Sequence, residues 1–198
     1  NGAKVINMSL GGDGSISPAL RSAIISATNQ GVLFTIAAGN EGAGPTPTEA
    51  AKGTVPSEPA IVAGDSALNG RVVAVGAVDA SGAMPTFSNR AGPTANFYLL
   101  APGVSIVLAG VDDNVRLPSQ PTCSAGVTTG CNDTDTDGDY WIGSGTSFAA
   151  PGVAGALALM LDLFPNIAPE TALRILLDTA DDYVTTTLDP VRGELAGV

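Results

Sequence analysis

A serine stands where a glycine-rich turn enters a long apolar run. Residues 143–147 read Gly-Ser-Gly-Thr-Ser, and the apolar run continues to residue 163. A hydroxyl at the amino end of a helix lies beside backbone N–H groups that can receive the negative charge of a tetrahedral intermediate. Ser147 is therefore a candidate nucleophile. The alternative, from these residues alone, is that Thr146 or Ser147 only caps the helix.

Asn40 is the second candidate for a catalytic role. It follows Gly39 at the end of the continuous apolar run 32–38, which is typical of a strand buried on both faces of a sheet. Open α/β sheets place their sites at the carboxyl ends of parallel strands, where Asn40 would lie. The alternative is an asparagine that only serves a turn.

Strand and helix patterns alternate around these candidates. Residues 5–10 are β-prone and closed by glycines, and Ser17-Pro18 supplies a helix cap and a first-turn proline. Gly31 ends that helix before strand 32–38, which completes a βαβ unit. Further strands are predicted at 72–78, 97–101 and 104–108. This order predicts an α/β fold with a doubly wound, mostly parallel sheet.

Two helices are predicted in the last third of the chain. Residues 147–163 are apolar nearly all round, which favours a central helix buried on every side. The last helix starts at Pro169, and its apolar face comprises Leu173, Ile175, Leu176 and Leu177.

Composition narrows the function classes. The 198 residues carry a net charge of −11, and the only lysines are Lys4 and Lys52, so nucleic acid and anionic membranes are poor partners. The longest uncharged apolar run, 148–161, is shorter than the roughly 20 residues that span a bilayer, so we expect no membrane span. The chain contains no histidine, the commonest general base.

Five ordered blocks resemble the subtilisin-like serine proteases, the subtilase family. Residues 145–155, Gly-Thr-Ser-Phe-Ala-Ala-Pro-Gly-Val-Ala-Gly, are similar to its nucleophile motif. The other blocks are 5–12, 37–42, 73–78 with Phe87-Ser88-Asn89, and 101–106. The resemblance covers nearly the whole chain. It implies that residues 1–198 are the C-terminal part of a subtilase catalytic domain, with a subtilisin-like fold that is incomplete at the N-terminus.

The resemblance also implies roles for individual residues. Ser147 would be the nucleophile of a serine endopeptidase, and the Asn40 carboxamide and Ser147 N–H would bind the oxyanion. The substrate is a polypeptide whose backbone would pair with Ser9, Leu10 and Gly11. The pocket for the residue before the cut would be lined by Ala37, Ala38 and Gly39, with Glu41 near its rim.

The family's catalytic Asp and His precede the serine, and this sequence has no His. We therefore expect an N-terminal half of the catalytic domain as a partner, and little activity from the chain alone. One alternative is a non-catalytic, peptide-binding or interaction domain derived from a subtilase. Another is a serine-carboxyl peptidase, in which an acid stabilises the oxyanion; Asn40 argues against it.

Two segments are expected as surface insertions, residues 41–60 and 111–140. The second contains Cys123 and Cys131, and such a pair in an acidic, secreted-type hydrolase favours a local disulfide and an extracellular or periplasmic location. The alternative is a reduced bystander pair.

An acidic run follows the cysteines. Asp133, Asp135 and Asp137, with Gly138, match the start of a calcium-binding loop, although Ser144 stands where a bidentate Glu is expected. Calcium is therefore a candidate cofactor, and a solvated acidic loop is the alternative.

If the three carboxylates share a cation, calcium should raise the melting temperature. A ligand bound only by the folded state stabilises it by about 2.7 kcal/mol at a hundredfold excess over Kd. Calorimetry with calcium and with a chelator tests this, and Asp135→Asn/Asp137→Asn should abolish the shift. Identical unfolding curves would leave only a solvated loop.

Overall fold

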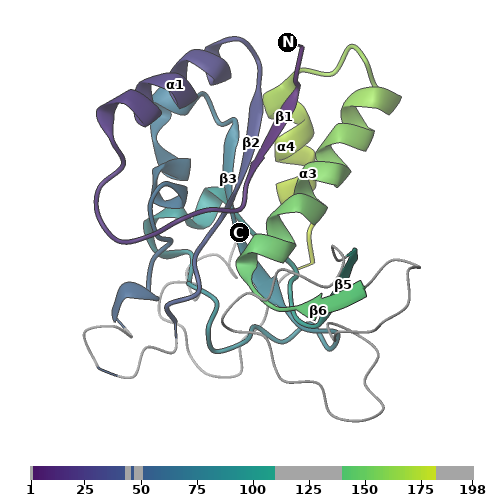
Figure 1. Ribbon diagram of the computed structural model, residues 1–198. Coiled ribbons are helices and arrows are strands. Elements are labelled where there is room, and N and C mark those ends of the chain that lie inside the picture. The colour runs from purple at the N-terminus through teal and green to yellow at the C-terminus, as the bar shows by residue number, and fades with distance from the viewer. Residues whose placement is uncertain (1, 43–45, 47–50, 110–139, 182–198) are drawn as a thin grey trace.

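The computed structural model describes residues 2–42, 46, 51–109 and 140–181 (Figure 1). Its central sheet has four parallel strands in the order β1-β2-β3-β4. Their bounds are β1 Val5–Met8, β2 Leu33–Ala37, β3 Val72–Val78 and β4 Tyr98–Pro102. This confirms the predicted α/β class and the parallel sheet.

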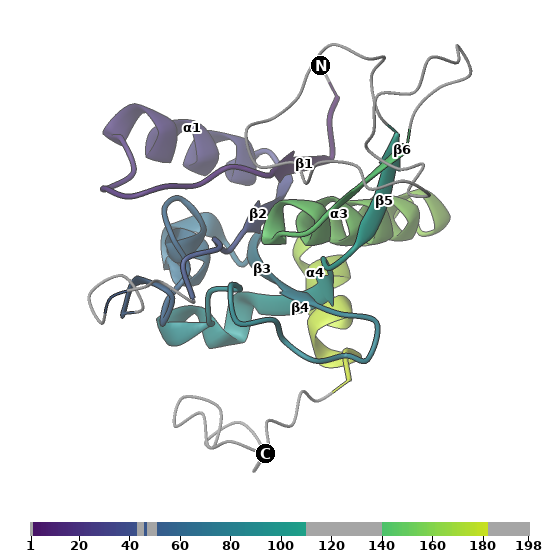
Figure 2. The same ribbon diagram turned by 60° about the horizontal axis from the view of Figure 1, so that its bottom comes forward.

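Helices cover both faces of this sheet, so the fold has three layers (Figure 2). One face carries α1 (Pro18–Asn29) and the 3₁₀ helices η1 (Ala60–Gly64), η2 (Ser66–Leu68) and η3 (Gly92–Phe97). The other carries α3 (Thr146–Leu163) and α4 (Pro169–Asp178).

The middle strands explain why the apolar runs are continuous. Every residue of β2 is buried, and alternate side chains enter different cores. Phe34 and Ile36 pack toward α1, whereas Leu33 and Ala37 pack toward α3 and α4. A strand with a core on each face has no solvent side, so it lacks the polar alternation of a surface strand.

The first helix forms as its sequence predicts. The Ser17 hydroxyl accepts a hydrogen bond from the Leu20 N–H at 3.2 Å, and Pro18 occupies the first turn. The helix ends at Asn29, and Gly31 follows with a positive φ of 85°.

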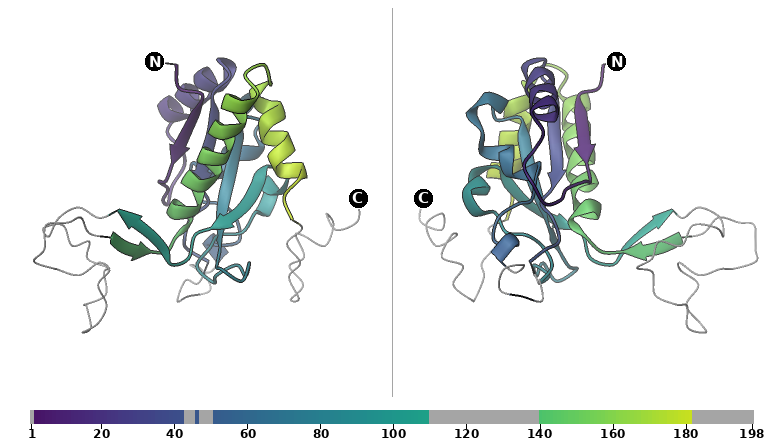
Figure 3. Two further views of the ribbon diagram at one scale, coloured as in Figure 1. Left: turned by 90° about the vertical axis from the view of Figure 1, so that its right-hand side faces the viewer. Right: turned by 60° about the vertical axis from the view of Figure 1, so that its left-hand side comes forward.

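The strand predicted at 104–108 does not join the parallel sheet. It is β5 (Ile106–Ala109), which pairs antiparallel with β6 (Tyr140–Gly143) in a separate two-stranded sheet. Figure 3 shows this ribbon standing away from the three layers. The strand β6 was absent from the sequence-based prediction, because its partner lies far away in the chain.

Burial of α3 on every side is a prediction that the structure corrects. One face packs on the sheet through Ala149, Ala150, Val153 and Leu157, but Leu159 is 66% exposed and Leu163 71% exposed. The sheet and α4 cover only part of the helix circumference. In α4, the predicted face is partly right, since Leu173 is buried but Ile175 is 42% exposed.

By length and composition, α3 also meets the requirement for a helix that could cross a membrane. It is 18 residues long, and it extends beyond the uncharged apolar run 148–161 by Thr146 and Ser147 at its start and Asp162 and Leu163 at its end. The core helix of a soluble protein, which is mostly buried, meets the same requirement. One face of α3 packs against the sheet, but only 28% of this helix is buried. The absence of a membrane span stays a prediction.

The stretch 41–60, expected at the surface, ends inside the core. Ala60 is fully buried with the side chains on the α1 face of the sheet. The reason is that η1 starts at Ala60 and packs under the sheet. The expectation is therefore wrong for this residue. The second predicted insertion, 111–140, lies outside the described residues except for Tyr140, the first residue of β6.

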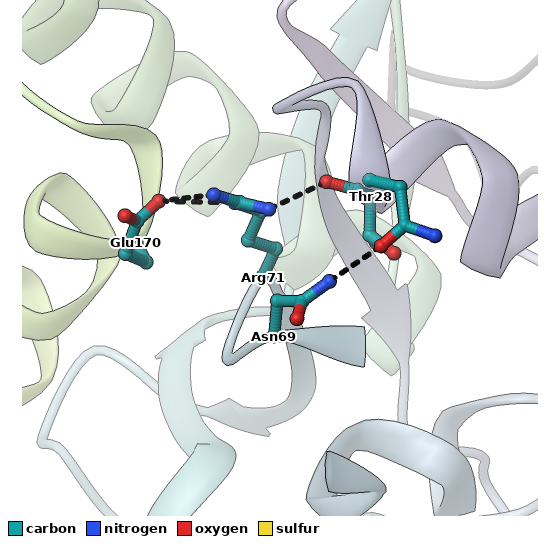
Figure 4. Close-up of polar contacts among 5 residues, drawn as sticks. Thr28, Asn69, Arg71 and Glu170 are labelled. Carbon is teal, nitrogen blue, oxygen red and sulfur yellow. Dashed lines mark hydrogen bonds and ion pairs between the residues drawn. The ribbon is translucent and has the colours of Figure 1, made fainter. Parts of the chain in front are cut away.

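Arg71 joins the layers beyond the amino end of β3 (Figure 4). Its guanidinium donates to the Thr28 carbonyl of α1 at 2.7 Å and to the Glu170 carboxylate of α4 at 2.8 Å. The backbone N–H of Glu170 and the Arg71 guanidinium hold the pKa of the Glu170 carboxyl below its ordinary value. One side chain thus ties together helices on opposite faces of the sheet.

Arg71→Met should lower the free energy of unfolding by about 1–2 kcal/mol, because the helix carbonyl and the carboxylate both lose a donor. Glu170→Gln should cost less than about 1 kcal/mol, since Glu170 is 42% exposed and the pair is partly screened. Arg174→Met is the control, because the Arg174–Asp178 pair is exposed at both ends.

The sign of the pH dependence follows from the lowered Glu170 pKa. Its contribution is present above the unfolded value, near 4.5, and is lost as the pH falls through the folded value. The stabilities of wild type and Glu170→Gln, measured by denaturation, should therefore converge as the pH falls below the unfolded value. A difference that did not shrink on acidification below that value would contradict the ion pair.

Candidate active site

Three chain segments meet at one edge of the sheet. The residues after β1 and β2 lie at the carboxyl ends of these strands, and α3 begins at the same edge (Figure 1). Ser9 follows β1, Asn40 follows β2, and Ser147 is the second residue of α3. The predicted nucleophile and amide are therefore brought together, 107 residues apart in the sequence.

The hydroxyl of Thr146 is the joint between β2 and α3. It accepts a hydrogen bond from the Gly39 N–H at 3.1 Å and lies 3.2 Å from Asn40 Oδ1, to which it donates. Thr146 is fully buried. A hydroxyl can accept and donate hydrogen bonds at the same time. The Thr146 side chain therefore provides an acceptor for the Gly39 N–H and also orients the Asn40 carboxamide.

The Asn40 carboxamide has only one orientation that fits. Its Oδ1 accepts from the Thr146 N–H at 2.9 Å, and a backbone N–H requires the oxygen rather than the amide nitrogen. Asn40 is exposed, and Nδ2 has no hydrogen bond among the described residues. The Ser147 N–H, in the first helical turn, is likewise unbonded among them. These two donors can bind an oxyanion beside the Ser147 hydroxyl.

A chain of hydrogen bonds fixes Ser147 from the β1 side. The Thr35 hydroxyl donates to Asn7 Oδ1, Asn7 Nδ2 donates to Ser9 Oγ, and the Ser9 hydroxyl donates to the Ser147 carbonyl at 2.7 Å. Thr35 is fully buried within β2. This series of hydrogen bonds therefore links β1 and β2 to the first turn of α3.

Gly39 allows the backbone to pass through a crowded point. Its φ is +108°, and a Cβ there would collide with the Glu41 carboxylate and lie 2.6 Å from Ser57 Oγ. The buried Asn89 holds the same loop, since its Oδ1 accepts from the Glu41 N–H at 2.8 Å and its Nδ2 donates to Glu41 Oε2 at 2.6 Å.

A pocket of about 250 Å³ opens between the continuations of β1 and β2. Its charged lining comprises Asp13, Glu41, Lys52 and Glu58. Gly12, Gly14, Val55, Pro56, Ser57 and Ile61 complete it. The Lys52 ammonium pairs with the Asp13 carboxylate at 2.6 Å.

The structure also shows where the residues predicted to bind substrate lie. The side chains of Ala37 and Ala38 are buried in the cores on the two sheet faces, so only their backbone could line a substrate pocket. Leu10 is 52% exposed, and Gly11 faces Ser57. Glu41 lines the pocket described above, whereas Ala37, Ala38 and Gly39 do not.

The calcium and disulfide predictions cannot be placed. Asp133, Asp135, Asp137, Cys123 and Cys131 lie outside the described residues. Within the described part of the chain, no group of three or more acidic, Cys or His side chains could hold a metal ion.

Three roles were not predicted from the sequence. Thr146 links the end of β2 to α3, Asn89 holds the loop at Glu41 by hydrogen bonds, and Glu58 lines the pocket. Thr146 and Asn89 do lie within the motif blocks, so their position was a usable signal. Glu58 had none, because it reaches the pocket through the irregular stretch after Asn40.

Comparison with known proteins gives a consistent result. The model of the "Subtilase family" matches residues 1–194. The chain is 32% identical over 177 residues to an "Extracellular protease" of Xanthomonas campestris, and 33% identical over 180 residues to "Subtilisin DY" of Bacillus licheniformis. These alignments cover 89% and 91% of the chain but 24% and 50% of the relatives.

Solved structures agree with these relatives. The "Prenylagaramide maturation protease PagA" superposes with a TM-score of 0.65 and 27% identity over 95% of this chain and 55% of that one. A protease from Pseudoalteromonas arctica gives a TM-score of 0.63 and 28% identity over 91% and 45%. The chain spans half or less of the curated relatives named above.

Thr146→Val should lower the free energy of unfolding by about 1–3 kcal/mol, because the buried Gly39 N–H loses its acceptor. Thr146→Ser, which keeps the hydroxyl, should recover most of this. Thr179→Val, at an exposed helix end, is the control and should change stability by less than about 0.5 kcal/mol. The free energies of unfolding are measured by chemical denaturation. Equal decreases for both valine variants would refute the proposed role of the Thr146 hydroxyl.

Proposed function

Because the chain belongs to the subtilase family, we propose that it carries the nucleophile and the oxyanion site of a serine endopeptidase. The observation that carries the proposal is the orientation of Asn40. Its carboxamide oxygen is held by the N–H of Thr146, the residue before Ser147, which leaves Nδ2 available to a substrate. Two donors at a hydroxyl-bearing helix start are what acyl transfer needs.

The reaction would proceed through an acyl-enzyme. The Ser147 Oγ forms a bond to the peptide carbonyl carbon, and the hydroxyl proton passes to a general base. The carbonyl oxygen becomes an oxyanion bound by Asn40 Nδ2 and the Ser147 N–H. When the oxyanion collapses, the C–N bond breaks and the amine leaves with that proton. Water then hydrolyses the ester by the same steps.

The polypeptide substrate would bind as an added strand along Ser9, Leu10 and Gly11, which continue β1 past its end. Ser9 is held against Ser147 by its hydroxyl, so the bound backbone would run past the nucleophile. The residue before the cut would then face the pocket beside Glu41.

We propose that the general base comes from outside this chain, because the chain has no His. We infer that an N-terminal half of the catalytic domain supplies the Asp and His of the triad. The chain alone would then be inactive. The exposed apolar side chains of Leu159 and Leu163 on α3 are consistent with a face that this half covers. A secreted protein is proposed because a relative is named as an extracellular protease.

The full-length protein should react with a fluorophosphonate at Ser147, and Ser147→Ala should abolish both labelling and peptide hydrolysis. Asn40→Leu should lower kcat by about 10²–10³-fold with little change in KM, the range known for removing this donor in a subtilisin. Asn69→Leu, remote from the site, is the control.

An unchanged kcat in Asn40→Leu would remove Asn40 from the oxyanion site. Peptide binding with neither labelling nor hydrolysis would favour the non-catalytic alternative, a peptide-binding or interaction domain, which the lack of His also favours.

A further inference from the structure

We propose that the buried Thr35 is a positioning residue for the nucleophile Ser147, and that it acts through Asn7 and Ser9. Its hydroxyl sets the direction of a series of three hydrogen bonds, so that the last of them ends on the Ser147 carbonyl. The inference rests on the proposed function, because it concerns the geometry of the same nucleophile.

Thr35 is the one polar residue of β2. The strand is buried along its whole length, and its other residues are Leu, Phe, Ile and Ala. Thr35 alternates with Leu33 and Ala37, so its side chain lies on the face of the sheet that α3 covers. A buried hydroxyl is costly unless it is hydrogen-bonded. In the described part of the chain, this hydroxyl donates to Oδ1 of Asn7, its register partner on β1, at 3.2 Å.

This hydrogen bond determines which way the Asn7 carboxamide faces. In the observed orientation, Oδ1 accepts from Thr35 and Nδ2 donates to Ser9 Oγ at 3.0 Å. A flipped carboxamide would leave the buried Thr35 proton without this acceptor. Asn7 itself is exposed, so water would satisfy either orientation, and the buried end of the series makes the difference.

The carboxamide in turn determines where the Ser9 hydroxyl donates. A flipped Asn7 would present Oδ1 to Ser9, and the Ser9 proton would be drawn to that oxygen. With Nδ2 facing Ser9, the hydroxyl oxygen acts as the acceptor and its proton points the other way. The Ser9 hydroxyl accordingly donates to the Ser147 carbonyl at 2.7 Å.

The Ser147 carbonyl needs a donor from outside its helix. In an α-helix, a carbonyl accepts from the N–H of the residue four positions later. For Ser147 this residue is Pro151, which lies inside α3 and has no N–H. The Ser9 hydroxyl therefore replaces the helical hydrogen bond that Pro151 removes.

Holding this carbonyl fixes the backbone of Ser147, and with it the hydroxyl and the N–H of the same residue. These are the proposed nucleophile and one of the two oxyanion donors. Misplacing a reacting group by about 1 Å can cost about 10²-fold in rate. Loss of one hydrogen bond at the carbonyl is a smaller change, so we expect kcat to fall by about threefold to tenfold. KM should change little, because the substrate would bind to main-chain groups of the β1 continuation.

Kinetics of the full-length protein test this series of hydrogen bonds. Thr35→Val replaces the hydroxyl with a methyl group and should lower kcat by about threefold to tenfold, whereas Thr35→Ser should retain the wild-type value. In a Ser9→Ala background, Thr35→Val should have no further effect on kcat, because both variants break the same series. The matched control is Thr94→Val. Thr94 is also buried, its hydroxyl donates to the Ala91 carbonyl at 2.8 Å, and its removal should leave kcat unchanged.

The Ser147 carbonyl can also be observed without catalysis. When the full-length protein carries ¹³C at its serine carbonyls and ¹⁵N at its phenylalanines, the Ser147–Phe148 peptide gives an NMR signal that Ser147→Ala removes. Loss of a hydrogen bond at a carbonyl moves its ¹³C resonance upfield. Thr35→Val and Ser9→Ala should both produce this shift, and Thr35→Ser and Thr94→Val should not.

An unshifted carbonyl resonance in Thr35→Val would overturn the proposal, as would additive decreases in kcat for Thr35→Val and Ser9→Ala. A shifted resonance in a protein whose wild type hydrolyses no peptide would support the series of hydrogen bonds and refute only the protease. Hydrolysis by the wild type that Thr35→Val leaves unchanged would refute the positioning role and leave the protease intact.

Discussion

The site depends on one buried hydrogen-bonding residue between a strand end and a helix start. The Thr146 hydroxyl accepts a hydrogen bond from the Gly39 N–H, and the Thr146 N–H donates to Asn40 Oδ1. These bonds fix both the position of the helix and the orientation of the carboxamide. If the helix shifted, both the nucleophile and the oxyanion donor would lose their geometry. Such a bond is effective because it is buried, where water does not compete with it.

The same edge shows how much could be predicted from the sequence. The apolar run before Asn40 and the glycine turn before Ser147 are local signals, and they correctly indicated a buried strand and a helix start. That these two elements meet follows from the rule that parallel strands end at one edge. The fold class was predictable for the same reason, since alternating strands and helices leave few arrangements.

What could not be predicted depends on non-local contacts in irregular segments. Glu58 reaches the pocket through a stretch with no periodicity, and β6 exists only because β5 pairs with it. The exposed face of α3 was missed for another reason. An apolar helix surface indicates that its burial is favourable. It does not indicate how many neighbouring elements the chain provides to cover it. The sequence therefore predicts that Leu159 and Leu163 are buried, whereas they are exposed in the structure.

That exposed face has a consequence for the behaviour of the chain in solution. Leu159, Leu163 and Phe164 form an apolar end on a chain whose net charge is −11. Mutual repulsion between copies opposes contact of these faces at low ionic strength. At about 1 M salt the Debye length falls to about 3 Å, the repulsion is screened, and the apolar attraction remains. Without the proposed N-terminal half to cover this face, we expect the colloidal stability of the chain to depend on ionic strength as well as on concentration.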